Sequence, residues 1–164
     1  MRLWRLSRRE DARRFDGGYG LTFDGRWNSQ GRPVTYCATA PSLCVLEVLV
    51  HGGEADLLPD RRVFVEFDAP DSLAVDAIEP DDLPAGWALM EEVTKRRGDA
   101  WLDGAARPLL RVPSVIVAEP GAPDGNVMIN HRHRDSSLIS ISRVTPFRFD
   151  PRLLAAKART IEPR

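Results

Sequence analysis

The stretch GRWNSQGRPVTYCATAPSLCVLEVLVHG, residues 25–52, decides the fold. A polar, glycine-containing segment leads into Val34–Ala38, whose composition is typical of a strand, and an apolar run follows. We expect a helix over Pro41–His51, because a proline suits its first turn and Thr39 or Ser42 is a suitable N-cap. A loop, a strand and a helix in direct succession indicate a mixed α+β protein.

The segments on either side of this stretch extend the same pattern. We expect strands over Arg2–Leu6, Arg61–Phe67, Leu109–Ala118, Leu138–Val144 and Phe147–Phe149, a helix over Trp87–Leu102, and loops over Phe15–Asn28 and Asp124–Asp135. In the first strand, Leu3 and Arg5 should face one side and Trp4 and Leu6 the other. The sum is a single compact α+β domain over residues 1–150, followed by a short basic tail over residues 151–164.

Length, composition and charge restrict the class of protein. The 164 residues suit one domain, and 43% hydrophobic with 29% charged residues is ordinary for a globular protein. The formal net charge of -1 argues against direct nucleic-acid binding, which usually needs a basic excess. Two cysteines, Cys37 and Cys44, indicate free thiols. The N-terminal residues lack the apolar core of a signal peptide, and no apolar run is long enough to cross a membrane, so we expect a cytoplasmic protein.

Glu47 is the residue whose position most needs an explanation. The predicted helix is apolar almost all round, and Leu43, Leu46, Glu47 and Val50 share one face by their spacing. A buried carboxylate without a partner costs several kcal/mol, so Glu47 must be paired, protonated or facing a cleft. An ion pair with an arginine explains the residue as well as a catalytic role does.

Three further residues carry little information one by one. Arg26 follows a glycine-rich segment and suits a phosphate or carboxylate, although most loop arginines are simply solvated. Tyr36 alternates with Val34 and Ala38 on one strand face, as core tyrosines do. Ser114, near a strand start in RVPSV, is uninformative alone.

Other arrangements of reactive residues point to no site. His131 and His133 could bind a metal, but the chain has one further histidine, His51, and we expect no metal site. The spacing of Cys37 and Cys44 does not fit a zinc or redox motif. FDGGYG is not a nucleotide-binding glycine motif, and the serine of RVPSV lacks the GxSxG elbow of many hydrolases.

Taken in order, these segments resemble the RES domain family, named for its arginine, glutamate and serine. The matching segments are LWRLS, GRWNSQGRPVTYCA, LCVLEVLVH, LPAGW, GDAWL, LLRVPSVIV, GNVMINHRH and FRFDPRL, which run in family order across almost the whole chain. One departure is INHRH, where the family pattern is INPxH. That departure makes His131 a doubtful site residue and leaves the other matches untouched.

The resemblance implies the toxin half of a bacterial toxin–antitoxin pair, and the implied toxin acts on NAD. The implied fold is similar to that of ADP-ribosyltransferases, a core of mixed or antiparallel β-sheets flanked by helices. The implied partner is a small Xre-like helix-turn-helix antitoxin that blocks the active site. The family's residues fall on Arg26, Tyr36, Glu47 and Ser114, and an early-strand arginine falls on Arg5.

The chemistry of NAD agrees with that assignment. Arg5 and Arg26 suit the pyrophosphate, and Tyr36 could stack on the flat, cationic nicotinamide ring. Breaking the nicotinamide–ribose bond develops positive charge on the ribose, which the Glu47 carboxylate would stabilise.

Two polar residues complete the predicted site. Ser114 could hold the ribose or fix the glutamate, and Asn126 is a candidate for hydrogen bonding in the pocket. The predicted catalytic set is therefore Arg26, Tyr36, Glu47 and Ser114, and the predicted NAD-binding set is Arg5, Arg26, Tyr36 and Asn126.

Three functions remain open on the sequence. The first is depletion of NAD by hydrolysis or phosphorolysis. The second is mono-ADP-ribosylation of a host metabolic protein, since surface loops decide the acceptor. The third is a non-enzymatic binding module of a repressor complex, in which DNA contact would come from the antitoxin.

Overall fold

The molecule is built around the predicted loop–strand–helix unit. The computed structural model describes residues 1–52, 61–119 and 121–154. The strands within these ranges are β1 (Arg2–Arg8), β2 (Val34–Ala38), β3 (Arg62–Asp68), β4 (Val75–Ala77), β5 (Leu109–Val112), β6 (Asn126–Asn130) and β7 (Ser140–Phe147). The α-helices are α1 (Gly18–Thr22), α2 (Pro41–His51) and α3 (Glu91–Gly104). Short 3-10 helices are η1 (Arg9–Asp11), η3 (Pro80–Asp82), η4 (Trp87–Leu89) and η5 (Arg134–Leu138).

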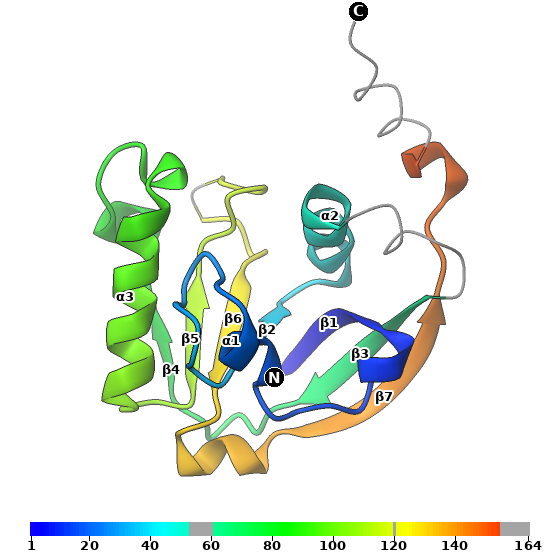
Figure 1. Cartoon of the computed structure of the whole chain (residues 1–164), viewed down its shortest axis with the longest axis horizontal. Helices are drawn as coiled ribbons and strands as arrows, with labels where there is room; N and C mark the ends of the chain where they lie inside the picture. The colour runs from blue at the N-terminus through cyan, green and yellow to red at the C-terminus, as the bar shows by residue number, and fades with distance from the viewer. Residues whose placement is uncertain (53–60, 120, 155–164) are drawn as a thin grey trace, which may run out of the picture.

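One mixed sheet runs through the molecule in the order β4-β5-β6-β2-β1-β3-β7 (Figure 1). Neighbouring strands are antiparallel except for β4 and β5, which are parallel. β1 pairs with β3 along its whole length but shares a single register pair with β2, Trp4 with Ala38. The sheet therefore has two halves that meet at this pair and diverge beyond it. The predicted α+β class is confirmed.

Three groups of buried apolar side chains hold these elements together. The first joins β1 to β3 and β6 and contains Leu3. The second lies under α3 and contains Trp27 and Leu102. The third lies under α2 and contains Leu6 and Leu43. Leu3 and Leu6 lie in different groups, which confirms the alternation predicted for the first strand. Burial of a large apolar side chain such as these contributes about 1.5–3 kcal/mol to the stability of the fold.

Helix α2 begins and ends where the sequence predicts. Its N-cap is Ala40, which offers no side-chain hydrogen bond, so the predicted cap from Thr39 or Ser42 is wrong. The Thr39 hydroxyl instead bonds to the backbone of the segment that leads into β6. This contact fixes the start of α2 against the sheet.

The apolar composition of α2 predicts a buried helix, but only one side of the helix is buried. Leu43 and Cys44 pack against the sheet, whereas Leu46 and Val50 are 38% and 58% exposed. The helix contacts β1 and β2 with one side only, so the side that carries Leu46, Glu47 and Val50 does not pack in the core. The carboxylate of Glu47 therefore sits at the edge of the packed interior.

The prediction of a loop over Asp124–Asp135 is wrong at its centre, where β6 lies between β2 and β5. Val127, Met128 and Ile129 are all buried, because both faces of this central strand are covered. Such a strand lacks the alternation of apolar and polar residues that identifies a half-exposed one. The three apolar residues between asparagines were too short a run to recognise.

Several other boundaries differ from the prediction. The loop over Phe15–Asn28 contains α1, a helix of five residues. The strand expected over Leu109–Ala118 ends at Val112, because the proline that follows has no N–H to donate to the sheet. The two closing strands form the single strand β7, and the helix expected from Trp87 begins as η4 before α3. Most of the predicted tail lies outside the described residues. None of the helices in the described ranges has the length and apolarity needed to cross a bilayer.

Candidate active site

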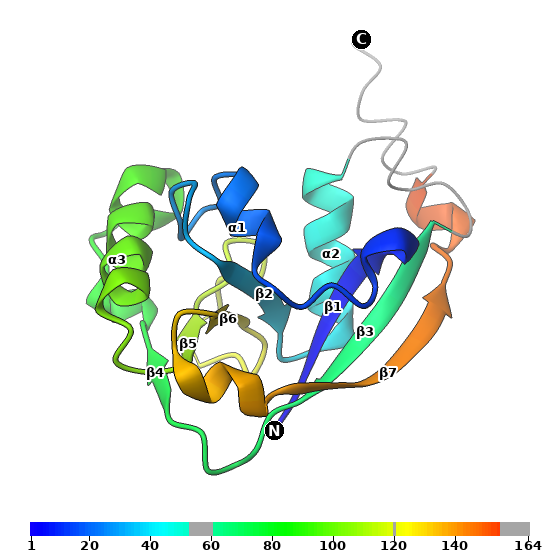
Figure 2. The ribbon, with the colours of Figure 1, turned by 60° about the horizontal axis from the view of Figure 1, so that its bottom comes forward.

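A cleft opens where the two halves of the sheet diverge. Helix α1 packs on β2, and α2 packs on β1 and β2 (Figure 2). Residues of both helices line the cleft. Its volume of about 1060 Å³ is slightly above the roughly 300–1,000 Å³ that is typical of small-molecule sites. The predicted site residues that line it are Arg5, Arg26, Tyr36, Glu47 and Asn126. Five of the six predicted positions therefore border one cleft.

Glu47 is fixed through one of its two carboxylate oxygens. Ser114 Oγ donates a hydrogen bond to Glu47 Oε1 at 3.3 Å, and Asn126 Nδ2 donates to the same oxygen at 2.8 Å. The two donors come from the segment after β5 and from the first residue of β6. Hydrogen bonds to a charged acceptor are worth about 1.5–3 kcal/mol each, so the carboxylate is held in one orientation.

The second carboxylate oxygen of Glu47 faces a histidine. Oε2 lies 3.5 Å from His51 Nε2, one helical turn further along α2. His51 also lines the cleft, and its side chain is 71% exposed against 27% for Glu47. Among the described residues no arginine pairs with Glu47, so the ion pair considered from the sequence is not the arrangement found. A carboxylate with one oxygen fixed and the other at an open cleft can act on a ligand.

Ser114 lies behind Glu47 and does not line the cleft. It is 1% exposed, and its Oγ accepts hydrogen bonds from the backbone N–H groups of Ile116 and Val117 at 3.1 and 3.3 Å. With these two bonds accepted, the hydroxyl proton is directed at Glu47. Of the two roles considered for Ser114, this geometry matches the one in which it fixes the glutamate.

Arg26 stands at the corner of a tight turn. Gly25 and Asn28 exchange backbone hydrogen bonds of 2.9 and 3.3 Å, which places Arg26 and Trp27 at the two corner positions. Trp27 is buried in the apolar group under α3 and anchors the turn. Arg26 lines the cleft instead, and its Nη1 donates to the carbonyl oxygen of Ala88 at 3.1 Å. The turn thus directs Trp27 into the core and Arg26 towards the cleft.

The hydroxyl of Tyr36 makes two hydrogen bonds to this turn. It donates to Asn28 Oδ1 at 2.7 Å and accepts from the Trp27 N–H at 3.3 Å. Burial raises the pKa of Tyr36 above its ordinary value, so the hydroxyl stays neutral. The aromatic ring is the part of Tyr36 that remains available to a ligand in the cleft.

Arg5 contributes a largely buried guanidinium with one unpaired group. Its Nη2 donates to the carbonyl oxygens of Arg14 at 2.9 Å and Asp11 at 3.4 Å, and its Cζ lies 5.4 Å from the centre of the Phe67 ring. Its Nε is the one buried side-chain nitrogen or oxygen in the described ranges without a hydrogen-bond partner. Burial lowers the pKa of Arg5. An anionic ligand would satisfy this donor and compensate the charge.

The histidines near β6 have structural contacts of their own. His131 Nε2 lies 2.8 Å from the hydroxyl of Thr35, and burial lowers the pKa of His131. His133 Nδ1 accepts from the N–H of Asp135 and caps η5. Both cysteines are buried free thiols. Across the part of the chain that the structure describes, no group of three or more potential ligands is placed to hold a metal ion.

Sequence reasoning missed two residues that shape the site. Asn28 is fully buried, and its Nδ2 donates to the carbonyl oxygens of Phe23 and Ser29, each at 3.2 Å. An asparagine three residues after a glycine is a recognisable turn residue, so its role was predictable in kind. His51 was predictable from its spacing of four residues after Glu47, which places both on one helix face.

The structure is therefore an α+β domain with a cleft that is bordered by arginines, Arg5 and Arg26 among them, and by a carboxylate fixed through one oxygen. The sequence model of the RES domain matches residues 2–150. The chain belongs to the RES domain family, as its motifs predicted.

Relatives match over nearly the whole chain. A protein of Sphingobium sp. (strain YBL2) named Prs ADP-ribosylating toxin is 33% identical over 160 residues, which are 92% of this chain and 95% of that one. A protein of Pseudomonas putida named Toxin Res is 34% identical over 152 residues, 89% of this chain and 97% of that one. A Toxin Res of Photorhabdus laumondii is 35% identical over 161 residues, 96% of this chain and 99% of that one.

Proposed function

We propose that this protein is a toxin that cleaves NAD at the bond between nicotinamide and ribose. The observation that carries the proposal is the carboxylate of Glu47, which borders the cleft while Ser114 and Asn126 fix one of its oxygens. Family membership supports the proposal, because one relative is named an ADP-ribosylating toxin and ADP-ribosylation consumes NAD.

In the proposed step the bond between ribose C1′ and the nicotinamide nitrogen breaks. Its electron pair leaves with the nitrogen, so nicotinamide departs as a neutral molecule and positive charge develops on the ribose. Glu47 stabilises that charge, because a carboxylate already fixed in place needs no reorganisation as the charge forms. An oxygen of the acceptor then bonds to C1′ and releases its proton.

The cleft offers counterparts to the pyrophosphate and to the nicotinamide ring of NAD. Arg26 and Arg5 would bind the pyrophosphate, whose oxygens would offer a hydrogen-bond acceptor to the unpaired Nε of Arg5. The ring of Tyr36 would stack on the cationic nicotinamide. Asn126 would act in the pocket through the oxygen of Glu47 that it already holds.

For the acceptor we propose water or phosphate, which would deplete the cell of NAD. The name of the Sphingobium relative favours a second candidate, transfer of ADP-ribose to a host protein. NAD labelled in its adenylate half separates the two when it is incubated with the toxin and a cell lysate. Label on a protein band supports transfer, and label recovered only in small molecules supports depletion.

We also propose that a small helix-turn-helix antitoxin covers this cleft in the cytoplasm. Tyr19, Phe23 and Val50 line the cleft, and each is more than half exposed. Large apolar side chains left in water at a cleft are typical of an interaction surface. Phe23→Ser should weaken co-purification of the proposed antitoxin when the two proteins are expressed together. Undiminished co-purification would exclude this surface.

The decisive test of the enzyme is release of nicotinamide from NAD by the purified protein. Glu47→Gln should lower the rate by at least about 100-fold with the fold intact, because the stabilising charge is lost. Glu92→Gln is the matched control, since this exposed carboxylate lies on α3 beside Lys95, outside the cleft lining. Unchanged turnover in Glu47→Gln would exclude the catalytic role. No nicotinamide release by the wild-type protein would favour a non-enzymatic binding module.

A further inference from the structure

We infer that the inner face of α3 sets the position of Arg26, with Gly98 and Asp99 as positioning residues for the binding of NAD. The inference rests on the proposed function and deepens it. Gly98 and Asp99 begin the segment GDAWL, which the proposed chemistry does not use. Neither residue lines the cleft, so any effect on the ligand must pass through residues that do, and Arg26 is the charged side chain of the turn that they hold.

Three residues of α3 hold consecutive parts of the turn. Thr94 Oγ1 donates to the carbonyl oxygen of Arg26 at 2.9 Å. A Cβ added at Gly98 would overlap the carbonyl oxygen of Trp27 and lie 2.8 Å from its carbonyl carbon, so only a glycine lets the turn approach this closely. Arg26 is therefore held at its own backbone and at that of its neighbour.

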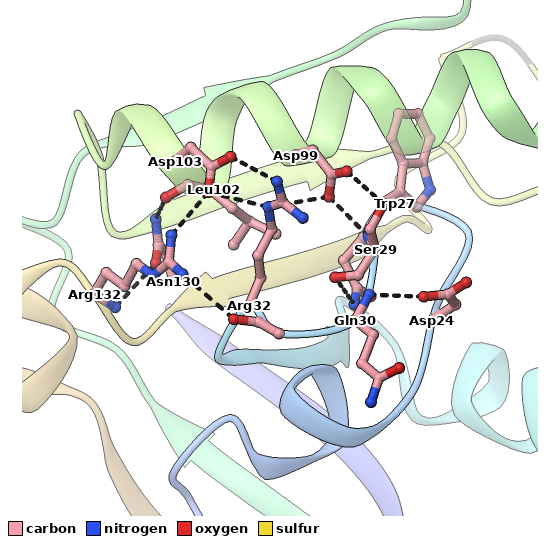
Figure 3. A network of polar contacts seen from close by, with 12 residues as sticks. Asp24, Trp27, Ser29, Gln30, Arg32, Asp99, Leu102, Asp103, Asn130 and Arg132 are labelled. Carbon is pink, nitrogen blue, oxygen red and sulfur yellow. Dashed lines mark hydrogen bonds and ion pairs between the residues drawn. The ribbon is translucent and has the colours of Figure 1, made fainter.

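Asp99 fixes the far end of the same turn. Its Oδ1 accepts from the Ser29 N–H at 2.8 Å, and its Oδ2 accepts from the Ser29 hydroxyl at 2.6 Å (Figure 3). Arg32 Nε lies 3.4 Å from Asp99 Oδ1 and neutralises part of its charge. A carboxylate that binds the backbone and the side chain of one residue defines where that residue lies.

Asp103, one turn further along α3, belongs to the same charged network but not to the turn. It pairs with Arg32 at 2.7 Å and with Arg132 at 2.8 Å (Figure 3). None of its contacts in the described ranges reaches residues 24–29. Asp103 is therefore a matched control for Asp99, since both are aspartates of α3 paired with Arg32.

The test compares Asp99→Ala with Asp103→Ala in nicotinamide release. Asp99→Ala frees Ser29 and with it the turn, so the KM for NAD should rise about tenfold while kcat stays within about twofold, as expected when a ground-state binding contact is weakened. Asp103→Ala should leave both constants within about twofold of the wild type, whatever it does to stability. Asp99→Asn keeps an acceptor for Ser29 and should recover part of the affinity.

A double variant distinguishes positioning from a general loss of structure. In an Arg26→Ala background, Asp99→Ala should raise the KM no further, because the group that it positions is absent. An equal KM in Asp99→Ala and Asp103→Ala would overturn the inference, and so would an undiminished effect in the Arg26→Ala background. If the wild-type protein releases no nicotinamide, the proposed function fails. The inference is then decided by calorimetry with ADP-ribose, where Asp99→Ala must weaken binding and Asp103→Ala must not.

Discussion

Replacing Gly98 by alanine tests how closely α3 must approach the turn that carries Arg26. The added Cβ would overlap the Trp27 carbonyl oxygen, and it would lie 2.8 Å from the carbonyl carbon and 3.0 Å from the Trp27 Cβ. Real Cβ atoms do not come this near to backbone atoms. Either the turn or α3 must therefore retreat.

The magnitude follows from two opposing effects. Overfilling a packed site typically costs about 1–3 kcal/mol, and we expect a cost of about 2–3 kcal/mol here, because the added Cβ meets backbone atoms and Trp27, which is 2% exposed, has no free space to move into. Alanine is a better helix former than glycine by about 1 kcal/mol, which offsets part of that cost. We expect a net loss of about 1–2 kcal/mol in the free energy of unfolding. For a domain of this size the Tm should fall by roughly 2–8 °C.

The assay is thermal unfolding of Gly98→Ala beside a matched variant, Gly104→Ala. Gly104 ends the same helix, and nothing lies within 4 Å of a Cβ added there, so this variant should be as stable as the wild type or slightly more so. Because the turn moves with residue 98, Gly98→Ala should also raise the KM for NAD. Equal melting temperatures in the two variants, with an unchanged KM, would refute the close-approach argument.

Three other substitutions test single contacts. Tyr36→Phe leaves Asn28 Oδ1 without its donor and should lower the free energy of unfolding by about 1–3 kcal/mol in urea; no loss would mean that the hydroxyl does not hold the turn. Ser114→Ala removes one of two donors to Glu47 and should slow nicotinamide release by about 10- to 100-fold with the KM little changed; full activity would exclude the fixing role. Burial holds the pKa of His131 below its ordinary value of 6.5, with Arg5 adding to the effect and a nearby aspartate opposing it. As the pH falls, His131 is therefore protonated in the unfolded chain before it is protonated in the folded one. The contribution of neutral His131 to the free energy of unfolding is complete above pH 6.5 and is lost below it by at most about 1.4 kcal/mol per pH unit. Urea unfolding at about pH 7.5 and pH 5.5 should show a weaker pH dependence in His131→Gln, and an equal dependence would contradict the assignment.

The elements that the sequence predicted well are those whose ends are marked by a proline or a glycine. Val34–Ala38 and Pro41–His51 have the predicted bounds, because Pro33 precedes the strand, Pro41 begins the helix and Gly52 follows it. Strand β6 was missed because side chains of the core cover both of its faces, and because one of its pairing partners, β2, lies far away in sequence. Propensity alone does not contain that information.

The sequence predicted which residues line the cleft, Ser114 excepted, better than it predicted how they are arranged. Glu47 was singled out because its helix looked buried, yet it borders a cleft beside a half-exposed face. Ser114 was an open choice between substrate and glutamate, and only the distance of 3.3 Å to Oε1 distinguishes them. The contacts of Asp99 with Ser29 join residues 70 positions apart, which no local pattern reveals.

Strand β6 connects the two parts of the proposed active site. Its first residue, Asn126, holds Glu47, and its last, Asn130, donates from Nδ2 to the carbonyl oxygen of Leu102 at 2.9 Å, which ties α3 and so the Arg26 turn to the sheet. The two asparagines should therefore affect different kinetic constants. Asn126→Ala loosens the carboxylate and should lower kcat, whereas Asn130→Ala loosens α3 and should raise the KM for NAD. Nicotinamide release is measured for each variant at a temperature where that variant is folded. If both variants changed the same kinetic constant, β6 would support the whole site and would not link separately to charge stabilisation and to phosphate binding.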